Sequence, residues 1–356
     1  MTRAEFLEAH PGIFFLDLDA PGLLQDYLHR TAVLPEGETV IAVAKAGDGN
    51  MNCTLRATTS AKRRLIVKQA RPWVEKYPQF AAPWDRALRE MQFYELAGSD
   101  ARLCTLLPNI VHTDVEDRLL VMEDLGDDGD CSDVYAGGVL RKDEVARLAK
   151  FLSQLHSKFQ GSSVVIELDN RGMRELNHAH IFDIPFVEDN GLDLDGVLPG
   201  LSGVAREIRA ERELIEQIRE LGGSVYLADA SDFADTACLL HGDFFPGSFL
   251  RTNDGLRVID PEFCFGGRPE FDSGVFLAHL VLGQQAPSLA QCWFDLYQPP
   301  SGHDETLMLQ MAGVEIIRRL LGYAQLPLDA DLQQRKAMLT IARALVLAPR
   351  RDLLLS

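Results

Sequence analysis

Runs of β-branched and other apolar residues dominate the first third of the chain, and their length predicts short strands. Strands are expected at Val40–Val43, Cys53–Ala57, Leu65–Lys68 and Arg118–Met122. N-terminal helices are indicated by the capping-box spacing of Thr2 and Glu5 and by the amphipathic stretch Leu23–Leu28, and another helix is expected at Trp84–Ala97. Strands interrupted by a single helix predict a small lobe built on a mixed β-sheet.

The hydrophobic period changes beyond Gly126. Apolar residues then recur at intervals of three and four, which is the stripe of a buried helix face; they are Val145, Leu148, Leu152, Leu155 and Phe159. Further helices are expected at Ser202–Leu221, Glu305–Leu321 and Asp331–Leu347, with a surface loop at Pro185–Leu201. The rest of the chain should therefore be mainly helical.

Together the two patterns predict an α+β, bilobal fold. A small mixed β-sheet lobe is expected over residues 1–123 and a larger, mainly helical lobe over residues 124–356. A chain of 356 residues is long enough to bury two separate cores.

Charge and cysteine content narrow the class of protein. The 53 acidic and 35 basic residues give a net charge of −18, which disfavours nucleic-acid and membrane partners because phosphates would be repelled. The N-terminus lacks the pattern of a signal peptide, and the six cysteines include no CxxC pair, so we expect a cytoplasmic protein with reduced thiols. The oligomeric state is left open, a homodimer included.

A loop with two glycines separates the first two predicted strands. It contains Gly47, Gly49, Asn50 and Asn52, and its glycines would let backbone N–H groups approach a phosphate closely. The loop has no third glycine at the usual spacing and no GKS or GKT, so it is not a Walker loop. A plain hairpin turn would have the same composition, and both interpretations stay open.

Two further positions in the first lobe suit nucleotide binding. Lys68 ends an apolar strand, from which a lysine could reach the α- and β-phosphates of ATP while Glu90, on the next helix, holds it in place. Glu123 and Leu125 close the lobe, where backbone groups could meet an adenine edge. The alternatives are a solvated lysine, a surface glutamate and an ordinary strand end.

The strongest local signal is the loop that begins with His241 and Asp243. It lies between short apolar runs, and Asp243 is placed to accept or orient the proton of an acceptor hydroxyl. Asp260 and Glu262 follow the next strand and are hard oxygen ligands suited to Mg²⁺, to which Ser248 could add a neutral oxygen. In this order and spacing the residues are typical of phosphoryl transfer from ATP, whereas a generic acidic turn would not need them all.

Three residues nearer the C-terminus could anchor the loop of Asp243 or contact a bound group. Asp272 could anchor the loop of Asp243, together with His241, by accepting backbone hydrogen bonds, although a plain helix N-cap would also explain it. Arg318 and Arg319 lie on a predicted helix, where neighbours point about 100° apart, so at least one should leave the apolar face. That arginine could meet an anionic group or form a surface salt bridge.

Over nearly its whole length the chain resembles the aminoglycoside phosphotransferase and choline kinase superfamily, and within it the 5-methylthioribose kinases. The resemblance is carried by the glycine loop, the lysine strand, the hinge after Met122, Ser248 in place of the superfamily's usual asparagine, and the Asp-x-Glu at Asp260–Glu262. It implies a protein-kinase-like fold, ATP and Mg²⁺ as cofactors, and a small-molecule acceptor, namely the anomeric hydroxyl of 5-methylthioribose. It also implies that the twin arginine ending at Arg319 recognises the substrate.

One departure from the family pattern affects the expected acceptor substrate. The family usually has a histidine two positions after the catalytic aspartate, and here that residue is Phe245. An aminoglycoside, choline or another amino alcohol is therefore an alternative acceptor, although paired arginines would oppose a cation. A nucleotide-binding pseudokinase is the alternative of another class, and it would predict damage to the lysine, the base or the metal residues.

Overall fold

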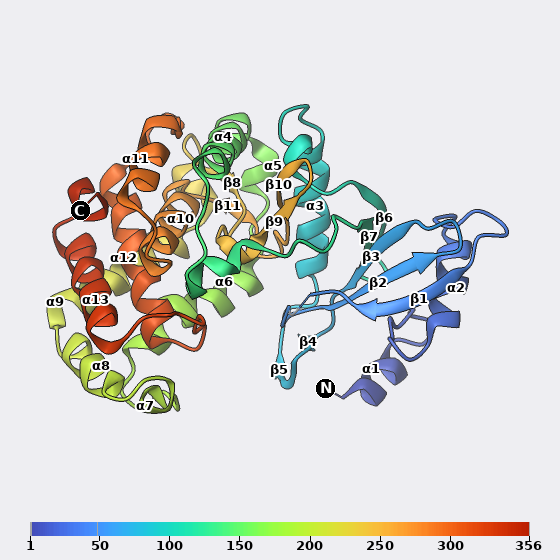
Figure 1. Cartoon of the computed structure of the whole chain (residues 1–356), viewed down its shortest axis with the longest axis horizontal. Helices are drawn as coiled ribbons and strands as arrows, with labels where there is room; N and C mark the ends of the chain where they lie inside the picture. Colours follow the sequence, from blue (N-terminus) through green and yellow to red (C-terminus); the bar gives the residue numbers. More distant parts are fainter. Residues whose placement is uncertain (1, 48, 356) are drawn as a thin grey trace. The chain divides into compact units, whose positions relative to one another are not determined.

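The chain folds into two compact units, Met1–Asp127 and Asp128–Ser356. The structure is a computed structural model that describes residues 2–47 and 49–355. Each unit has its own hydrophobic core, and the two differ in class, because the first is built on a sheet and the second mainly on helices (Figure 1). This confirms the α+β, bilobal prediction. The division predicted after Glu123 falls at the last residue of strand β7.

A five-stranded antiparallel sheet in the order β1-β2-β3-β7-β6 forms the centre of the N-terminal unit. The strands are β1 (Val40–Lys45), β2 (Cys53–Thr59), β3 (Arg64–Gln69), β6 (Ile110–Asp114) and β7 (Leu119–Glu123). Side chains of β2 alternate between buried and partly buried, as a strand with one face on the core requires. Register places Lys68 on β3 opposite Thr54 of β2 and Leu120 of β7, which puts this lysine in the central strand.

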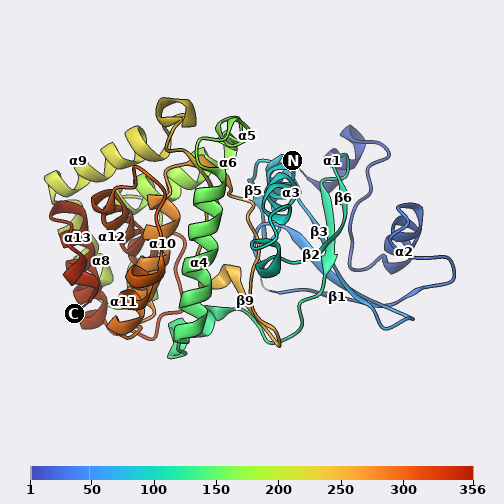
Figure 2. The ribbon, with the colours of Figure 1, turned by 90° about the horizontal axis from the view of Figure 1, so that it is seen from above.

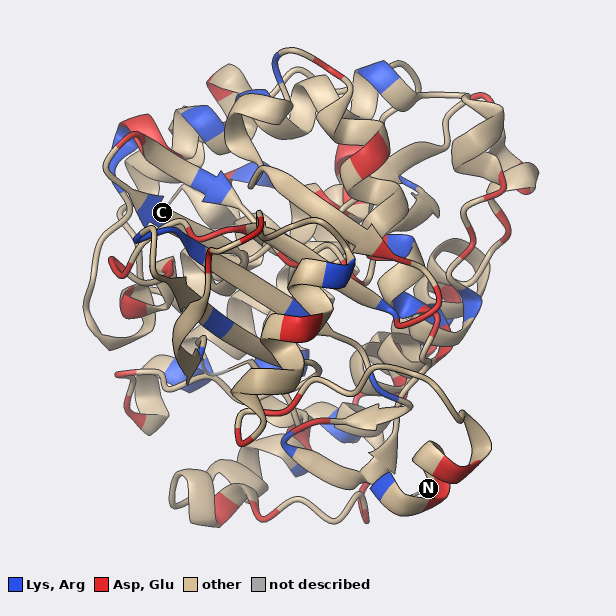
Figure 3. Cartoon of the chain, turned by 90° about the vertical axis from the view of Figure 1, so that its right-hand side faces the viewer, with Lys and Arg blue, Asp and Glu red and all other residues tan. Residues whose placement is uncertain are grey.

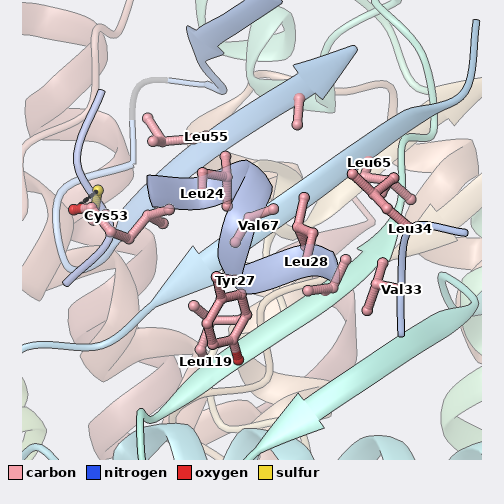
Figure 4. Packing of buried hydrophobic residues seen from close by; sticks show 13 residues of the cluster. Leu24, Tyr27, Leu28, Val33, Leu34, Cys53, Leu55, Leu65, Val67 and Leu119 are labelled. Carbon is pink, nitrogen blue, oxygen red and sulfur yellow. Dashed lines mark hydrogen bonds between the residues drawn. The ribbon is translucent and has the colours of Figure 1, made fainter. Parts of the chain in front are cut away.

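Three helices accompany this sheet: α1 (Arg3–Ala9), α2 (Pro21–Arg30) and α3 (Arg86–Gly98). The capping box predicted for α1 is present, because Thr2 accepts from the Glu5 N–H while Glu5 accepts from the Thr2 N–H. Helix α2 packs its apolar face on the sheet (Figure 4). Leu24, Tyr27 and Leu28 lie there against strand residues that include Leu55 and Val67.

Strand β6 and a small hairpin are not predicted by the sequence pattern. The hairpin consists of β4 (Trp73–Val74) and β5 (Tyr77–Ala81), and every residue of β5 is exposed. In β6 exposed and partly buried residues alternate, and none of them is fully buried. Neither segment contains an apolar run like those from which the other strands of the sheet were predicted.

The C-terminal unit is a helical assembly around α10 and α12, and α4 runs past its small strands (Figure 2). The stripe predicted from Val145 to Phe159 is confirmed as the buried face of α4. The α-helices of the C-terminal unit are α4 (Lys142–Phe159), α5 (Ser163–Ile166), α6 (Arg171–His178), α7 (Leu194–Val197), α8 (Leu201–Arg209), α9 (Arg212–Leu221), α10 (Glu270–Leu282), α11 (Pro287–Leu296), α12 (Glu305–Leu321) and α13 (Leu332–Leu347).

Two details of the helical prediction need correction. The single helix expected at Ser202–Leu221 is two helices, because the backbone turns to an extended conformation at Glu211. The loop expected at Pro185–Leu201 contains the short helix α7, which is capped by Asp193. Two π-helical turns, η3 (Ala179–Asp183) and η5 (Gly222–Tyr226), continue α6 and α9.

Two pairs of short strands hold the loop of Asp243. They are β8 (Cys238–Leu240) with β11 (Phe265–Gly267), and β9 (Phe249–Thr252) with β10 (Gly255–Val258), both antiparallel. The loop of Asp243 leaves β8 and enters β9, while the segment of Asp260 and Glu262 connects β10 to β11. Both loops therefore start and end in the same two small sheets.

All six cysteines are free, and five of them are buried. Burial raises the pKa of the Cys53 thiol to about 11 and that of Cys131 to about 12. Cys104 is the exposed one. No helix in the described part of the chain is both long enough and apolar enough to cross a bilayer. Acidic and basic residues are interspersed over many elements (Figure 3).

Candidate active site

In the N-terminal unit, the predicted pair of Lys68 and Glu90 is formed. Lys68 Nζ lies 2.8 Å from Glu90 Oε1 and 2.7 Å from Oε2, and both side chains are buried. Strand β3 supplies the lysine and helix α3 the glutamate. The interpretation as a solvated surface lysine is therefore wrong, because a desolvated cation is held by a carboxylate.

The glycine loop connects β1 to β2, as the sequence indicated. Gly47 has a φ of +70°, a left-handed conformation that favours glycine. Gly49 and Asn50 are exposed, whereas Asn52 is buried and its side-chain oxygen accepts from Arg86 Nε at 3.1 Å. Residue 48, which belongs to the predicted loop, lies outside the described residues.

The segment after β7 is fixed by its neighbours. The Glu123 N–H donates to the carbonyl of Asn109 at 2.9 Å, and its carboxylate accepts from the Asn109 N–H at 2.8 Å. The next residue, Asp124, pairs with Arg56 at 2.7 Å and with Arg64 at 2.5 Å. These bonds hold the backbone that leads to Leu125 in one conformation.

In the C-terminal unit, the loop of Asp243 is anchored by hydrogen bonds to Asp272. Asp272, in the first turn of α10, accepts from the backbone N–H groups of His241 at 2.7 Å and Gly242 at 3.0 Å. Asp272 is not the N-cap of α10, so of the two interpretations the anchor applies. The Asp243 N–H donates to Nδ1 of His241, whose Nε2 then carries the proton and donates to the Ile259 carbonyl at 2.9 Å.

Asp243 itself keeps an exposed edge, with 23% of its side chain accessible. Burial raises the pKa of its carboxyl group to about 6, against the lowering effect of Arg319 and Arg318. A carboxylate with that pKa is ionised at neutral pH and is a better proton acceptor than an ordinary aspartate. Ser248 Oγ donates to the Asp243 carbonyl at 2.9 Å, which ties the two ends of the loop together.

The residues predicted to hold Mg²⁺ fit a hard cation by their chemistry. Asp260 and Glu262 supply carboxylate oxygens, and Ser248 keeps acceptor lone pairs while its proton donates. Asp260 has a φ of +66°, a strained conformation for a residue other than glycine and one that often marks functional positions. No cluster of three or more His, Cys, Asp or Glu suited to a metal occurs among the described residues, so other oxygens would have to complete the shell.

Both arginines of α12 are buried, so the alternative of a surface salt bridge is wrong. They retain 7% and 6% exposure and converge on Glu315, a residue the sequence analysis overlooked. Glu315 contacts Arg318 NH1 at 3.0 Å and Arg319 Nε at 2.6 Å. Positions three and four residues along a helix share a face with the first, so one carboxylate reaches both arginines. The spacing Glu-x-x-Arg-Arg was the signal for it.

Arg319 connects this cluster to Asp243. Its NH2 lies 3.4 Å from Asp243 Oδ1, and its guanidinium lies over the ring of Phe245 at 4.7 Å. Arg318 extends the other way and donates to Asn177 Oδ1 at 3.2 Å, while Asn177 donates to the Tyr226 hydroxyl. Phe245, in the position of the family histidine, thus supports an arginine through its ring face.

Comparison with known proteins agrees with this arrangement. The model of the family described as "Phosphotransferase enzyme family" matches residues 43–306. A methylthioribose kinase from Exiguobacterium sibiricum is 26% identical over 275 residues, which cover 72% of this chain and 65% of that protein. A methylthioribose kinase from Pectobacterium atrosepticum is 25% identical over 384 residues, covering 91% of this chain and 92% of that protein. The matched region thus spans just under two thirds of the first relative and nearly all of the second.

Solved structures share the fold. Choline kinase LicA from Streptococcus pneumoniae aligns with a TM-score of 0.51 at 14% identity over 91% of this chain and 98% of its own. Spectinomycin phosphotransferase APH(9)-Ia, in complex with ADP and spectinomycin, aligns with a TM-score of 0.54 at 12% identity over 93% and 98%. At these identities the likeness concerns the fold alone, and it confirms the protein-kinase-like prediction.

Proposed function

Because the chain belongs to the phosphotransferase enzyme family, we propose that it transfers the γ-phosphate of ATP to a hydroxyl of a small metabolite. The first candidate acceptor is the anomeric hydroxyl of 5-methylthioribose, since methylthioribose kinases are relatives over most of the chain. This is the substrate class that the resemblance implied from the sequence.

The proposed roles divide between the two units. In the N-terminal unit, Lys68 held by Glu90 binds the α- and β-phosphates, and the loop of Gly47 and Gly49 offers backbone N–H groups. The backbone at Glu123 and Leu125 receives the adenine. Lys68 is suited to its role because its ammonium is already oriented by a buried carboxylate.

In the C-terminal unit, Asp243 accepts the proton of the acceptor hydroxyl as the oxygen attacks phosphorus. Its raised pKa supports this role, and the anchor from Asp272 keeps its loop rigid. Asp260, Glu262 and Ser248 would hold Mg²⁺, which when bound neutralises charge on the phosphate oxygens.

The observation that carries the choice of acceptor is the position of the arginines. Arg319 reaches Asp243, and a guanidinium there offers several donors and no acceptor to whatever binds beside the base. Such donors suit an oxygen-rich sugar. A cationic acceptor such as an aminoglycoside or choline would instead bring its positive charge beside the guanidinium of Arg319, which offers it no acceptor and repels it.

The test is ADP release with Mg²⁺-ATP over a panel of 5-methylthioribose, ribose, choline and an aminoglycoside. Activity on the thiosugar should exceed that on the amines, and ³¹P NMR of the product should show a phosphate on the anomeric oxygen. The variant Asp243→Asn is the control for background ATP hydrolysis. Turnover of choline or the aminoglycoside alone would overturn the acceptor, and no turnover with any compound would support the pseudokinase alternative.

A further inference from the structure

A chain of buried polar groups runs through the C-terminal unit behind Asp243. It begins at Tyr135 in η2 (Cys131–Ala136), passes through His279 on α10 and ends at Glu315 on α12. The Tyr135 hydroxyl lies 2.6 Å from His279 Nδ1, and His279 Nε2 lies 3.2 Å from Glu315 Oε1. All three side chains are buried. None of them was a candidate on sequence grounds, and none reaches the surface on which a substrate could sit.

The direction of each bond in this chain can be assigned. Arg318 and Arg319 hold the pKa of Glu315 well below its usual range, although burial alone would raise it, so Glu315 is an anion that only accepts. His279 Nε2 must then carry a proton and donate to Glu315, which leaves Nδ1 to accept from the Tyr135 hydroxyl. Burial lowers the pKa of His279 to about 4, which agrees with a neutral ring in this tautomer.

The bond from His279 therefore orients the Glu315 carboxylate independently of the two arginines. Its Oε1 accepts from His279 on one side and from Arg319 Nε on the other, and both of its oxygens contact Arg318 NH1. Arg319, held at Nε, turns its NH2 towards Asp243. A guanidinium fixed at one nitrogen has few remaining orientations, because the group is planar and its donors form a rigid fork.

We propose that Glu315 is a positioning residue, which orients Arg318 and Arg319 beside Asp243 and keeps their charge balanced inside the unit. The proposal rests on the proposed function for its effect on turnover, since it assigns the oriented arginines to acceptor binding. Glu315 acts through the arginines and touches neither ATP nor the acceptor. Its loss should therefore weaken acceptor binding and leave ATP binding, which is assigned to the N-terminal unit and the Mg²⁺ ligands, nearly unchanged.

Three variants isolate this role. Glu315→Gln keeps the size of the side chain and removes its charge, Glu315→Asp keeps the charge but is one methylene shorter, and Glu305→Gln is the matched control. Glu305 lies in the first turn of the same helix and pairs at the surface with Arg351, so the same chemical change occurs there without buried partners. With 5-methylthioribose as the acceptor, Glu315→Gln should raise the KM for the thiosugar about tenfold or more, with the KM for ATP changed less than about twofold.

Glu315→Asp should give a smaller rise in the KM for 5-methylthioribose, since the charge is kept but both arginines cannot be reached together. It also covers the case in which Glu315→Gln fails to fold because two buried cations are left unbalanced. Equal effects on the two KM values, or no effect of Glu315→Asp, would overturn the positioning role. A merely structural glutamate would lower the amount of active protein and leave both KM values in place.

A readout without turnover separates this proposal from the function itself. In protein labelled with ¹⁵N-arginine, the Nε–H of Arg319 should exchange slowly with solvent in the wild type and at least about tenfold faster in Glu315→Asp. Slow exchange in both proteins would show that Glu315 does not hold Arg319. If the exchange changes as expected but wild-type protein does not phosphorylate 5-methylthioribose, the positioning stands and the proposed acceptor falls.

Discussion

The substitution Gly242→Ala should damage the C-terminal unit far more than Gly129→Ala, although the two glycines have nearly the same backbone conformation. Their φ values are +83° and +79°, so an added Cβ has the same intrinsic cost at both positions. That cost is about 1–2 kcal/mol for a residue in the left-handed region. The two sites differ in their surroundings. Nothing lies within 4 Å of a Cβ at position 129, whereas at position 242 it would stand 2.1 Å from the carbonyl oxygen of Phe263.

The size of the difference follows from what must move. Contacts under 3.0 Å are essentially never made by real Cβ atoms, and the atom in the way belongs to the backbone. The loop must therefore shift by about 1 Å, which would strain the two bonds that Asp272 accepts from His241 and Gly242. Hydrogen bonds to a charged group are worth about 1.5–3 kcal/mol each. Gly242→Ala should thus cost about 3–5 kcal/mol more than Gly129→Ala.

Urea unfolding followed by far-UV circular dichroism measures the difference directly, and ADP release at low temperature reports whether a folded variant is active. At about 2–4 °C per kcal/mol for a unit of this size, thermal unfolding should show a gap in melting temperature of about 6–20 °C. Gly242→Ala should also lose turnover, because the same loop carries Asp243. If the two variants have the same unfolding midpoint and the same turnover, the loop is not held as described and the reasoning fails.

Three further outcomes are expected. Asp243→Asn should lower turnover by about two or more orders of magnitude with little change in the KM for ATP. Turnover of the wild type should rise with pH through about 6, because the base must be ionised, and a pH-independent rate would remove Asp243 from this role. Lys68→Met should destabilise the N-terminal unit by about 3–5 kcal/mol, because it removes the cation that a buried carboxylate pairs with. Adding Glu90→Gln should recover most of the stability but not the activity, as thermal melts and ADP release would show. His279 has a folded-state pKa of about 4, below its unfolded value, so its contribution to stability is present above about pH 6.5 and is lost as pH falls towards 4. The free energies of unfolding of the wild type and His279→Gln, taken from denaturation curves, should therefore converge by up to about 3 kcal/mol over that pH range. A difference that stays constant with pH would contradict the assignment.

Local signals in the sequence were enough to predict most elements and the position of the proposed catalytic loop between β8 and β9. Alternation or period marked β2, α4 and α12, and the order of Lys68, Asp243 and Asp260 indicated phosphoryl transfer before any contact was known. The break between α8 and α9 left no such mark, because neither glycine nor proline occurs at Ala210 or Glu211. Helix propensity is a weak guide where tertiary packing ends a helix.

The buried network of Tyr135, His279 and Glu315 could not be predicted from the sequence, for a different reason. Tyr135, His279 and Glu315 come from three elements separated by long stretches of chain, and no local pattern in the sequence links them to one another. Only the fold brings them together. Arg318 and Arg319 were recognised from the sequence, but their shared partner Glu315, one turn before them on the same helix, was not.

The distribution of the cysteines has a practical consequence for labelling. Five thiols are buried, and the raised pKa values of Cys53 and Cys131 keep those two protonated near neutral pH, where the protonated form is unreactive. A maleimide dye should therefore attach to Cys104 in the native chain without any engineered residue. That position follows α3, the helix that carries Glu90, so the fluorophore would tag the lysine-bearing unit alone.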